Sequence, residues 1–590
     1  MAHAAGPAIA ASASVPIARY NMVHDNPGEQ PFSTKYRHPD WLKAHGYKGM
    51  VARLFLPCTV SYAAFDPTLM PPGSPARQKV DAYAETVRAA IRESHAAGLP
   101  IYPFTDILVL PKTIVEKYGA ELTSVHAADA THGTLGGAGL QASTLAPRTE
   151  ALLRAQITEI FERFPDLDGL TTRFGETYLF EWPEYSGSSP ARTPEEQRRL
   201  IEILRDEVCV KRGKTLFYRT WDFGRFHTNP ALYLAATDPV PPHPKLFFSI
   251  KHVGADFLRL QPFNQTLGIG RHQQIVEVST SQAGVYGKNA HPYYFTRGVL
   301  DGWPRYRWIS EANRWRSLRA LTASPLFKGV WTWSRGDGWR GPYIDNEMWV
   351  DLAEDVMAGF CSAPHRSEPS LFAESARRVT GVSGGDLPLL RELCLLSTNA
   401  TLAGQDTVHM TPAEWGGGET RTDPATGKPL LLTGSYRQQW WCRDDCISAI
   451  DLEPVVRAGK SRVVLAEKAG ATRDWRRIEA LSRRIRLPDP AKQSFLEVSC
   501  SYGRIKYALF EQIWIMQILA AEAAAIGANP SAEPMRAAIA AYDRLWSEWL
   551  KLKTAHADCP SLYSDTQVKY VDAPPFRQVL EGYRASLPAR

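Results

Sequence analysis

Short runs of apolar and β-branched residues alternate with amphipathic helical segments along the first 364 residues. Eight of these runs have the length and composition of strands and are bounded by turn residues. They span residues 17–24, 49–56, 99–108, 167–176, 215–222, 245–252, 274–280 and 328–335. Helical periodicity predicts helices at residues 80–97, 148–164, 194–210 and 305–321. Thr193 and Glu196 have the spacing of a capping box at the start of the third of these helices. Strands that alternate with helices predict an α/β fold with a parallel sheet.

Polar or charged side chains close nearly every predicted strand. They are His24, Asp25, Asp106, Glu176, Asp222, Lys251, Glu277 and Arg335. In a (β/α)8 (TIM) barrel all eight carboxyl ends surround one mouth, whereas in a doubly wound sheet only those beside the switch point meet. The pattern therefore favours a (β/α)8 barrel over a doubly wound sheet.

After about residue 365 the pattern changes to long helical segments with few strand signals. The helical stretches include residues 388–397, 473–486 and 507–519. A chain of 590 residues is too long for one hydrophobic core, so more than one domain is expected. We expect a flexible tail at residues 1–16, a catalytic barrel at 17–364 and a mostly helical C-terminal domain at 365–590.

Composition narrows the classes of function. The 590 residues include 22 % charged and 44 % hydrophobic residues, as in an ordinary globular protein. The formal net charge of +6 is spread over the chain, so we expect no nucleic-acid partner. No run of about 18 apolar residues is present, so we expect no membrane span. The 17 Trp and 23 Tyr side chains offer flat faces for stacking on sugar rings, although many must serve the core.

The cysteines and histidines give no metal signature. Cys442 and Cys446 have a Cys-x3-Cys spacing without a second pair, which leaves a disulfide open. The histidines at 24, 252, 272 and 291 lack ligand spacing, so we expect neither a metal nor a cofactor. The N-terminal stretch lacks the basic and Leu-rich regions of a signal peptide, and both cytoplasm and periplasm stay open as locations.

Three acidic residues at the predicted barrel mouth are candidates for catalysis. Glu176 follows the fourth strand, Asp256 lies shortly after the sixth, and Glu277 lies in the seventh. Two carboxyl groups in one cleft suit glycosidic bond cleavage, because one protonates the leaving oxygen while another activates water or attacks carbon. The alternative is that each acid pairs with a nearby Arg or Lys for structure.

Three cations come from matching strand ends, namely Arg173, Arg219 and Lys251. Together they would bind an anionic group, and a sugar carboxylate suits them better than a phosphate because no Walker-type loop is present. The alternative, that they only neutralise the three acids, is equally open. The candidate stacking platforms for sugar rings are Trp182, Trp221, Trp331 and Trp333.

Four motifs, in this order, resemble the barrel of the xylan α-glucuronidases, glycoside hydrolase family 67. They are Leu-Asp-Gly-Leu-Thr-Thr-Arg-Phe-Gly-Glu (167–176), Leu-Phe-Tyr-Arg-Thr-Trp-Asp (216–222), Phe-Ser-Ile-Lys-His-Val-Gly-Ala-Asp-Phe (248–257) and Ile-Val-Glu-Val-Ser-Thr (275–280). The segment 330–339 and the helices after it are similar in layout. The chain therefore resembles that family as a distant relative rather than as a member.

This resemblance implies a role for each charged candidate. Glu176 would be the general acid, Asp256 and Glu277 would act together as the base, and the three cations would bind the uronate. The expected function is an exo-acting, α-glucuronidase-like glycoside hydrolase whose partner is an oligosaccharide bearing a uronic acid. An exo-glycosidase for a neutral sugar, a polysaccharide lyase and a non-catalytic carbohydrate-binding barrel are the alternatives. The helical domain could also form a homodimer.

Overall fold

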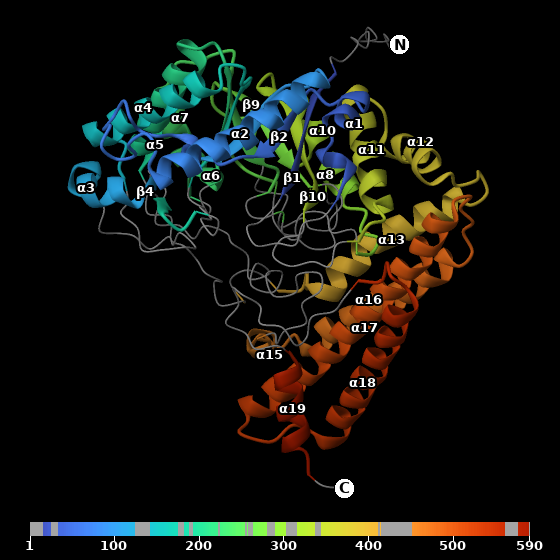
Figure 1. The fold of residues 1–590 in the computed structure, drawn as a ribbon. Coiled ribbons are helices and arrows are strands. Elements are labelled where there is room, and N and C mark those ends of the chain that lie inside the picture. The colour runs from blue at the N-terminus through green and yellow to red at the C-terminus, as the bar shows by residue number, and fades with distance from the viewer. Residues whose placement is uncertain are drawn as a thin grey trace, which may run out of the picture.

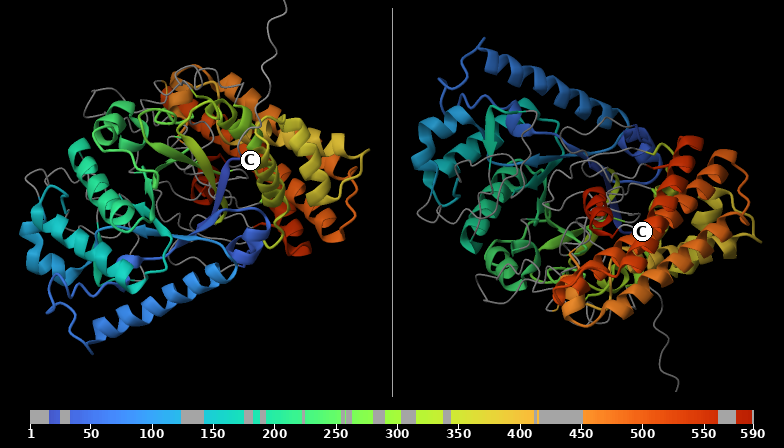
Figure 2. Two further views of the ribbon diagram at one scale, coloured as in Figure 1. Left: turned by 90° about the horizontal axis from the view of Figure 1, so that it is seen from above. Right: turned by 90° about the horizontal axis from the view of Figure 1, so that it is seen from below.

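Eight parallel strands close into a barrel in the order β1-β10-β9-β8-β7-β5-β3-β2 (Figures 1 and 2). They are β1 (Ala18–His24), β2 (Gly49–Arg53), β3 (Ile101–Asp106), β5 (Gly169–Arg173), β7 (Thr215–Arg219), β8 (Leu246–Lys251), β9 (Gln273–Val278) and β10 (Phe327–Gly336). Each lies within or next to a predicted strand, so the (β/α)8 barrel is confirmed. Gly169 allows β5 and β7 to approach closely, because a Cβ atom there would lie 2.0 Å from the carbonyl oxygen of Thr215.

The computed structural model describes residues 16–24, 33–123, 142–174, 182–187, 193–221, 225–253, 257, 263–279, 290–302, 315–336, 344–410, 414, 451–560 and 576–588.

The helices of the barrel part are α1 (Pro39–Ala44), α2 (Pro75–Ala96), α3 (Lys112–Leu122), α4 (Pro147–Arg163), α5 (Pro194–Leu204), α6 (Arg225–Thr228), α7 (Pro230–Thr237), α8 (Thr296–Asp301) and α10 (Leu318–Leu321). Two short 3-10 helices lie at Lys35–Arg37 and Leu56–Thr59. Strands β4 (Val109–Pro111) and β6 (Tyr185–Gly187) form a small antiparallel sheet that the sequence pattern did not predict.

Helix boundaries follow local capping chemistry. The predicted capping box of α5 is confirmed, since Thr193 Oγ1 accepts from the Glu196 N–H at 3.1 Å and Glu196 Oε2 accepts from the Thr193 N–H at 3.2 Å. The predicted helix 194–210 is not uniform, because α5 continues from Leu204 as a π-helix at Arg205–Val210. Helix α2 begins before predicted residue 80, because Ser74 caps its first turn and Pro75 suits that position.

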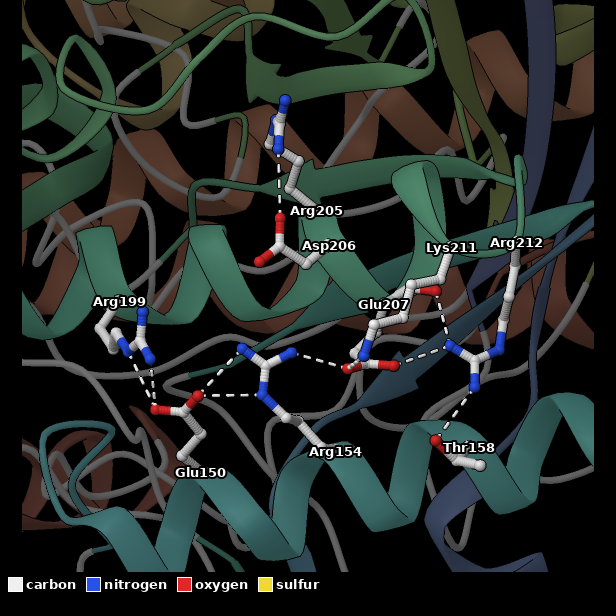
Figure 3. A network of polar contacts seen from close by, with 9 residues as sticks. All are labelled: Glu150, Arg154, Thr158, Arg199, Arg205, Asp206, Glu207, Lys211 and Arg212. Carbon is white, nitrogen blue, oxygen red and sulfur yellow. Dashed lines mark hydrogen bonds and ion pairs between the residues drawn. The ribbon is translucent and has the colours of Figure 1, made fainter.

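A network of ion pairs, which we call the outer cluster, joins α4 to α5 and the π-helix (Figure 3). It consists of Glu150, Arg154, Arg199, Glu207, Lys211 and Arg212. The buried Glu207 carboxylate accepts from Arg154 and Lys211 at 2.6 Å each and from Arg212 at 2.8 Å. Glu150 binds Arg154 at 2.9 Å and Arg199 at 2.5 Å. These contacts fix the helical layer outside the barrel.

The barrel lumen is filled by side chains from alternate positions of the strands, as the two-residue period of a strand requires. Its apolar cluster consists of Met22, Val51, Tyr102, Phe104, Phe217, Val253, Phe257, Ile275, Trp331 and Trp333. Aromatic rings dominate it, and Tyr102 meets Phe217 edge to face at 4.9 Å. The positions two residues beyond Phe104, Phe217 and Ile275 therefore face the same lumen, one layer nearer to the carboxyl ends of the strands.

Beyond β10 the described chain is helical. The helices are α11 (Met348–Ser362), α12 (Glu368–Thr380), α13 (Leu387–Gln405), α15 (Glu453–Arg457), α16 (Ser461–Ser482), α17 (Pro490–Ala525), α18 (Ala532–Ala555) and α19 (Phe576–Ser586). In Figure 1 they descend from one side of the barrel, and α15 and α19 lie below it. The predicted boundary at residues 364 and 365 falls between α11 and α12; the division into domains stays a prediction.

Helix α17 forms the centre of this helical region. It packs against α13, α15, α16 and α18. Among the described residues it is the one helix long and apolar enough to cross a membrane, with a mean hydropathy of 1.2 in its most apolar window. Half of that window is buried inside the protein. A core helix meets the same criterion, so the finding is weak support for a span, and the absence of one stays a prediction.

Candidate active site

Charged side chains form a layer at the carboxyl ends of the barrel strands. Asp106 lies opposite Arg173 in the pairing of β3 with β5, Arg219 opposite Ser249 in β7 and β8, and Lys251 opposite Glu277 in β8 and β9. We call Asp106, Arg173, Arg219, Ser249 and Glu277 the mouth cluster. In a TIM barrel this end carries the active site.

Glu277 has no exposed surface, and its carboxylate is held by two neighbours. Arg219 Nε donates to its two oxygens at 2.8 and 3.0 Å, and Ser249 Oγ donates to Oε1 at 3.0 Å. A buried carboxylate requires such partners, because its charge has lost its water. Arg219 uses only Nε in these bonds, and its two Nη nitrogens make no further hydrogen bond within the described part of the chain. They can therefore donate to an anion placed beside Glu277.

Arg173 is bound to Asp106 rather than to a catalytic candidate within the described residues. Its Nη2 donates to Asp106 Oδ2 at 2.7 Å and its Nε donates to Oδ1, and both side chains are buried. The ring of Phe104 lies beneath both arginines, 5.2 Å from the Arg173 guanidinium carbon and 5.1 Å from that of Arg219. Bidentate pairing fixes the orientation of a guanidinium group. The two ion pairs therefore pack against the same aromatic ring, that of Phe104.

Lys251 is buried among aromatic rings. Its Nζ lies 3.6 Å from the ring centre of Trp221, 5.3 Å from that of Phe257 and 5.9 Å from that of Trp333. Such cation–π contacts are stronger where water is excluded. Its strand position beside Glu277 brings this ammonium group into the same layer as the mouth cluster.

The four candidate stacking residues do not lie together. Trp331 and Trp333 meet edge to face at 5.8 Å in the lumen, and Trp221 covers Lys251. Trp331 Nε1 is buried and has no hydrogen-bond partner within the described residues. Trp182 lies in a different apolar cluster near β4 and β6, packed on Tyr83 at 5.1 Å and Tyr185 at 5.5 Å.

Two of the three catalytic candidates, Glu176 and Asp256, lie outside the described residues, and their roles stay predictions. The strand-end residues Asp25 and Asp222 also lie outside them. The pair Cys442 and Cys446 does so as well.

Several residues of the candidate site were not predicted from the sequence. Ser249 was not among the candidates, although it shares the inward face of β8 with Lys251, two residues away, and that alternation was a usable signal. Asp106 was noted at a strand end, but its pairing with Arg173 depends on the register of two strands far apart in sequence. Arg53 ends β2 on the inward face and was also missed.

Two histidines near the mouth, His227 and His252, are buried. Burial lowers the pKa of His252 to about 3, so its ring is neutral at physiological pH. Burial likewise lowers the pKa of His227, whose Nδ1 meets Thr220 Oγ1 at 2.7 Å. Among the described residues no group of three or more His, Cys, Asp or Glu side chains is arranged to hold a metal ion.

The strand order and the charged layer define the chain as a (β/α)8 barrel with a helical C-terminal region. No protein-family model matches the sequence, and no curated protein matches it either. Among solved structures, it is similar to a glycoside hydrolase family 138 enzyme targeting pectin rhamnogalacturonan II, with 11 % identity and a TM-score of 0.55. That match covers 97 % of this chain and 66 % of the enzyme, so the chain spans slightly less than two thirds of it. At this identity the likeness shows a shared fold.

Two further structures match less well. One is an O-GlcNAc hydrolase from Thermobaculum terrenum, with 8 % identity, a TM-score of 0.36, and coverage of 97 % of this chain and 94 % of that one. The other is a family 20 exo-β-N-acetylglucosaminidase from Vibrio harveyi, with 12 % identity, a TM-score of 0.30, and coverage of 63 % and 57 %.

Proposed function

We propose that the chain is an exo-acting glycoside hydrolase that cleaves an oligosaccharide bearing a uronic acid, in the manner of the α-glucuronidases. One observation carries the proposal. At the barrel mouth a buried carboxylate, Glu277, is bound by Arg219, whose Nη nitrogens make no hydrogen bond within the described residues, and it stands opposite Lys251 in the pairing of β8 with β9. This arrangement offers an acid or base for the reaction and two cations for a substrate carboxylate within one layer.

In this proposal each candidate has one task. Glu176 protonates the leaving oxygen, while Asp256 and Glu277 activate water on the opposite face of the sugar. Arg219 and Lys251 bind the uronate directly, and Arg173 supports it through its fixed position on Asp106. The stacking platforms for the sugar rings are Trp221, Trp331 and Trp333, with Trp182 toward a more distant subsite. The structural neighbour that targets pectin rhamnogalacturonan II supports a carbohydrate substrate. No cofactor, nucleic acid or membrane takes part.

A second candidate is an exo-glycosidase for a neutral sugar. It is favoured by the two ion pairs of the mouth cluster, because Asp106 and Glu277 already neutralise Arg173 and Arg219. In that case the cations would serve the acids alone.

Product analysis separates the two candidates. The purified protein is incubated with aldouronic acids from glucuronoxylan, with rhamnogalacturonan II fragments, and with neutral oligosaccharides. Release of free glucuronic acid, its 4-O-methyl ether or another uronate supports the first candidate. Turnover of neutral substrates alone would overturn it in favour of the second.

A further inference from the structure

The chain that follows β9 is fastened to the helical region before it forms α8. Three atoms of Tyr294 make this attachment. Its N–H donates to Ser397 Oγ at 3.2 Å, its carbonyl oxygen accepts from Thr398 Oγ1 at 2.9 Å, and its hydroxyl donates to Glu368 Oε1 at 2.6 Å. Tyr294 is 4 % exposed, so these bonds are shielded from water. Residues of α12 and α13 therefore fix both the backbone and the side chain of this segment.

The acceptor, Glu368, is itself fixed. Arg391 Nη1 donates to Glu368 Oε1 at 2.7 Å, and Arg391 Nη2 donates to Oε2. The Arg391 guanidinium carbon lies 4.5 Å above the ring of Phe372, which also meets the Tyr294 ring edge to face at 5.0 Å. Burial raises the pKa of Tyr294 well above its ordinary value, so the hydroxyl keeps the proton that it donates. The attachment is thus a rigid unit of aromatic rings and one ion pair.

A packed path leads from this unit to the barrel mouth. Phe295, the next residue, lies with its ring 5.7 Å from that of His252. The His252 ring stacks on Phe257 at 5.3 Å, and its backbone N–H donates to the carbonyl oxygen of Glu277 at 2.9 Å. His252 also follows Lys251 directly in the chain. The path therefore ends on the backbone of the two charged residues that stand opposite each other in β8 and β9.

We propose that Tyr294 and Glu368 are positioning residues, through which the helical region holds Glu277 and Lys251 in their working geometry. The consequence for catalysis rests on the function proposed above, whereas the mechanical consequence does not. In this arrangement the helical region is part of the catalytic unit, because small displacements of a reacting group lower turnover strongly.

The test removes one hydroxyl and uses a matched control. Tyr294→Phe deletes the bond to Glu368 without changing the ring, whereas Glu368→Gln weakens the same bond and also removes the charge that pairs with Arg391. The control is Tyr47→Phe, because Tyr47 is also buried and donates to a buried carboxylate, Glu354, at 3.1 Å. Tyr47 lies two residues before β2, at the opposite end of the barrel. We expect both tyrosine variants to lose similar stability, since each loses one buried hydrogen bond.

Steady-state kinetics distinguish a positioning role of Tyr294 and Glu368 from a purely stabilising one. At a temperature well below unfolding, kcat of Tyr294→Phe and Glu368→Gln on the hydrolysed sugar should fall roughly 5- to 50-fold while KM changes about 3-fold or less. Tyr47→Phe should keep the wild-type kcat. Wild-type kcat in folded Tyr294→Phe, or an equal loss in Tyr47→Phe, would overturn the proposal.

A second readout needs no activity. Hydrogen–deuterium exchange of residues 246–278 should be faster in Tyr294→Phe than in the wild type, and unchanged in Tyr47→Phe. If the wild type hydrolyses no sugar, the proposed function fails while this measurement still decides whether Tyr294 positions the two strands. Unchanged exchange in β8 and β9 sinks the proposal. Should Tyr294→Phe not fold, Thr398→Val, which removes only the donor to the Tyr294 carbonyl, takes its place with the same expected outcomes.

Discussion

The outer cluster and the mouth cluster are both built from carboxylates and arginines, but they differ in how each charge is surrounded. In the outer cluster one buried carboxylate, Glu207, binds three cations, each of which has part of its side chain in solvent (Figure 3). In the mouth cluster each carboxylate has one cationic partner among the described residues, and both members of each pair are buried. In the outer cluster the three cations occupy both oxygens of the Glu207 carboxylate, an arrangement that suits a stabilising role. The mouth cluster holds a buried charge in place while leaving donor capacity on Arg219, which suits a binding or catalytic site.

Replacement of Glu277 by Gln should give the largest effect. The amide has the size of the carboxylate and can still accept from Ser249, but it can neither take up a proton nor balance Arg219. We expect kcat to fall about 100-fold or more while substrate binding persists. Steady-state kinetics together with equilibrium binding measure this. The same change in the outer cluster, Glu207→Gln, is the control, and full turnover by Glu277→Gln would remove Glu277 from the mechanism.

Replacement of Lys251 by Met should give the next largest effect, and it should depend on the substrate. The methionine keeps an apolar stem against Trp221 but loses the charge. For uronate-bearing oligosaccharides, kcat/KM should fall about 10- to 150-fold, the equivalent of one charge-assisted hydrogen bond. Neutral oligosaccharides should be affected about 3-fold or less. Equal losses on both kinds of substrate would assign Lys251 a structural role.

In the outer cluster, Glu207→Gln should reduce the stability of the fold without changing kcat. Three cations lose their shared counter-charge, and we expect the free energy of unfolding to fall by about 1–3 kcal/mol. Denaturant unfolding followed by circular dichroism measures this loss. Below the unfolding transition kcat should equal that of the wild type, and a lowered kcat would show that the two clusters are coupled.

The smallest expected effect is a dependence of stability on pH. Burial alone would raise the pKa of Glu207, but hydrogen bonds from Lys211, Arg212 and Arg154 outweigh it and lower that pKa from its ordinary 4.5. A group with a lowered folded-state pKa stabilises fully above its ordinary value, and this contribution is lost as the pH falls through the lowered pKa. The melting temperature of the wild type should therefore drop below pH 4.5 more steeply than that of Glu207→Gln. Parallel curves would contradict this.

The sequence predicted the barrel well, because each strand is a local run of apolar and β-branched residues with a polar end. It could not predict β4 and β6, since strands of three residues carry no measurable period. The helix expected at 194–210 departs from an α-helix over its last six residues, Arg205–Val210, where the backbone widens into a π-helix that no propensity distinguishes. Ser74 and Pro75, by contrast, are an ordinary N-terminal signature, and attention to them would have placed the start of α2 correctly.

The site was predictable as a set of strand ends, but not as a set of pairs. Alternation along β7, β8 and β9 is enough to bring Arg219, Lys251 and Glu277 to one face. Whether Arg219 binds Glu277, or Arg173 binds Asp106, depends on the closure and register of the whole barrel. These are non-local properties, and the packing of Trp182 into a separate cluster near β4 and β6 depends on them in the same way.

The ring of Phe104 touches the guanidinium groups of both ion pairs from below. A change in the size of this ring would alter the packing of both guanidinium groups at once, so the two ion pairs are coupled through Phe104. Variant libraries of the barrel mouth should therefore change Phe104 together with Arg173 and Arg219, because a library that varies one position at a time alters one contact of a coupled set.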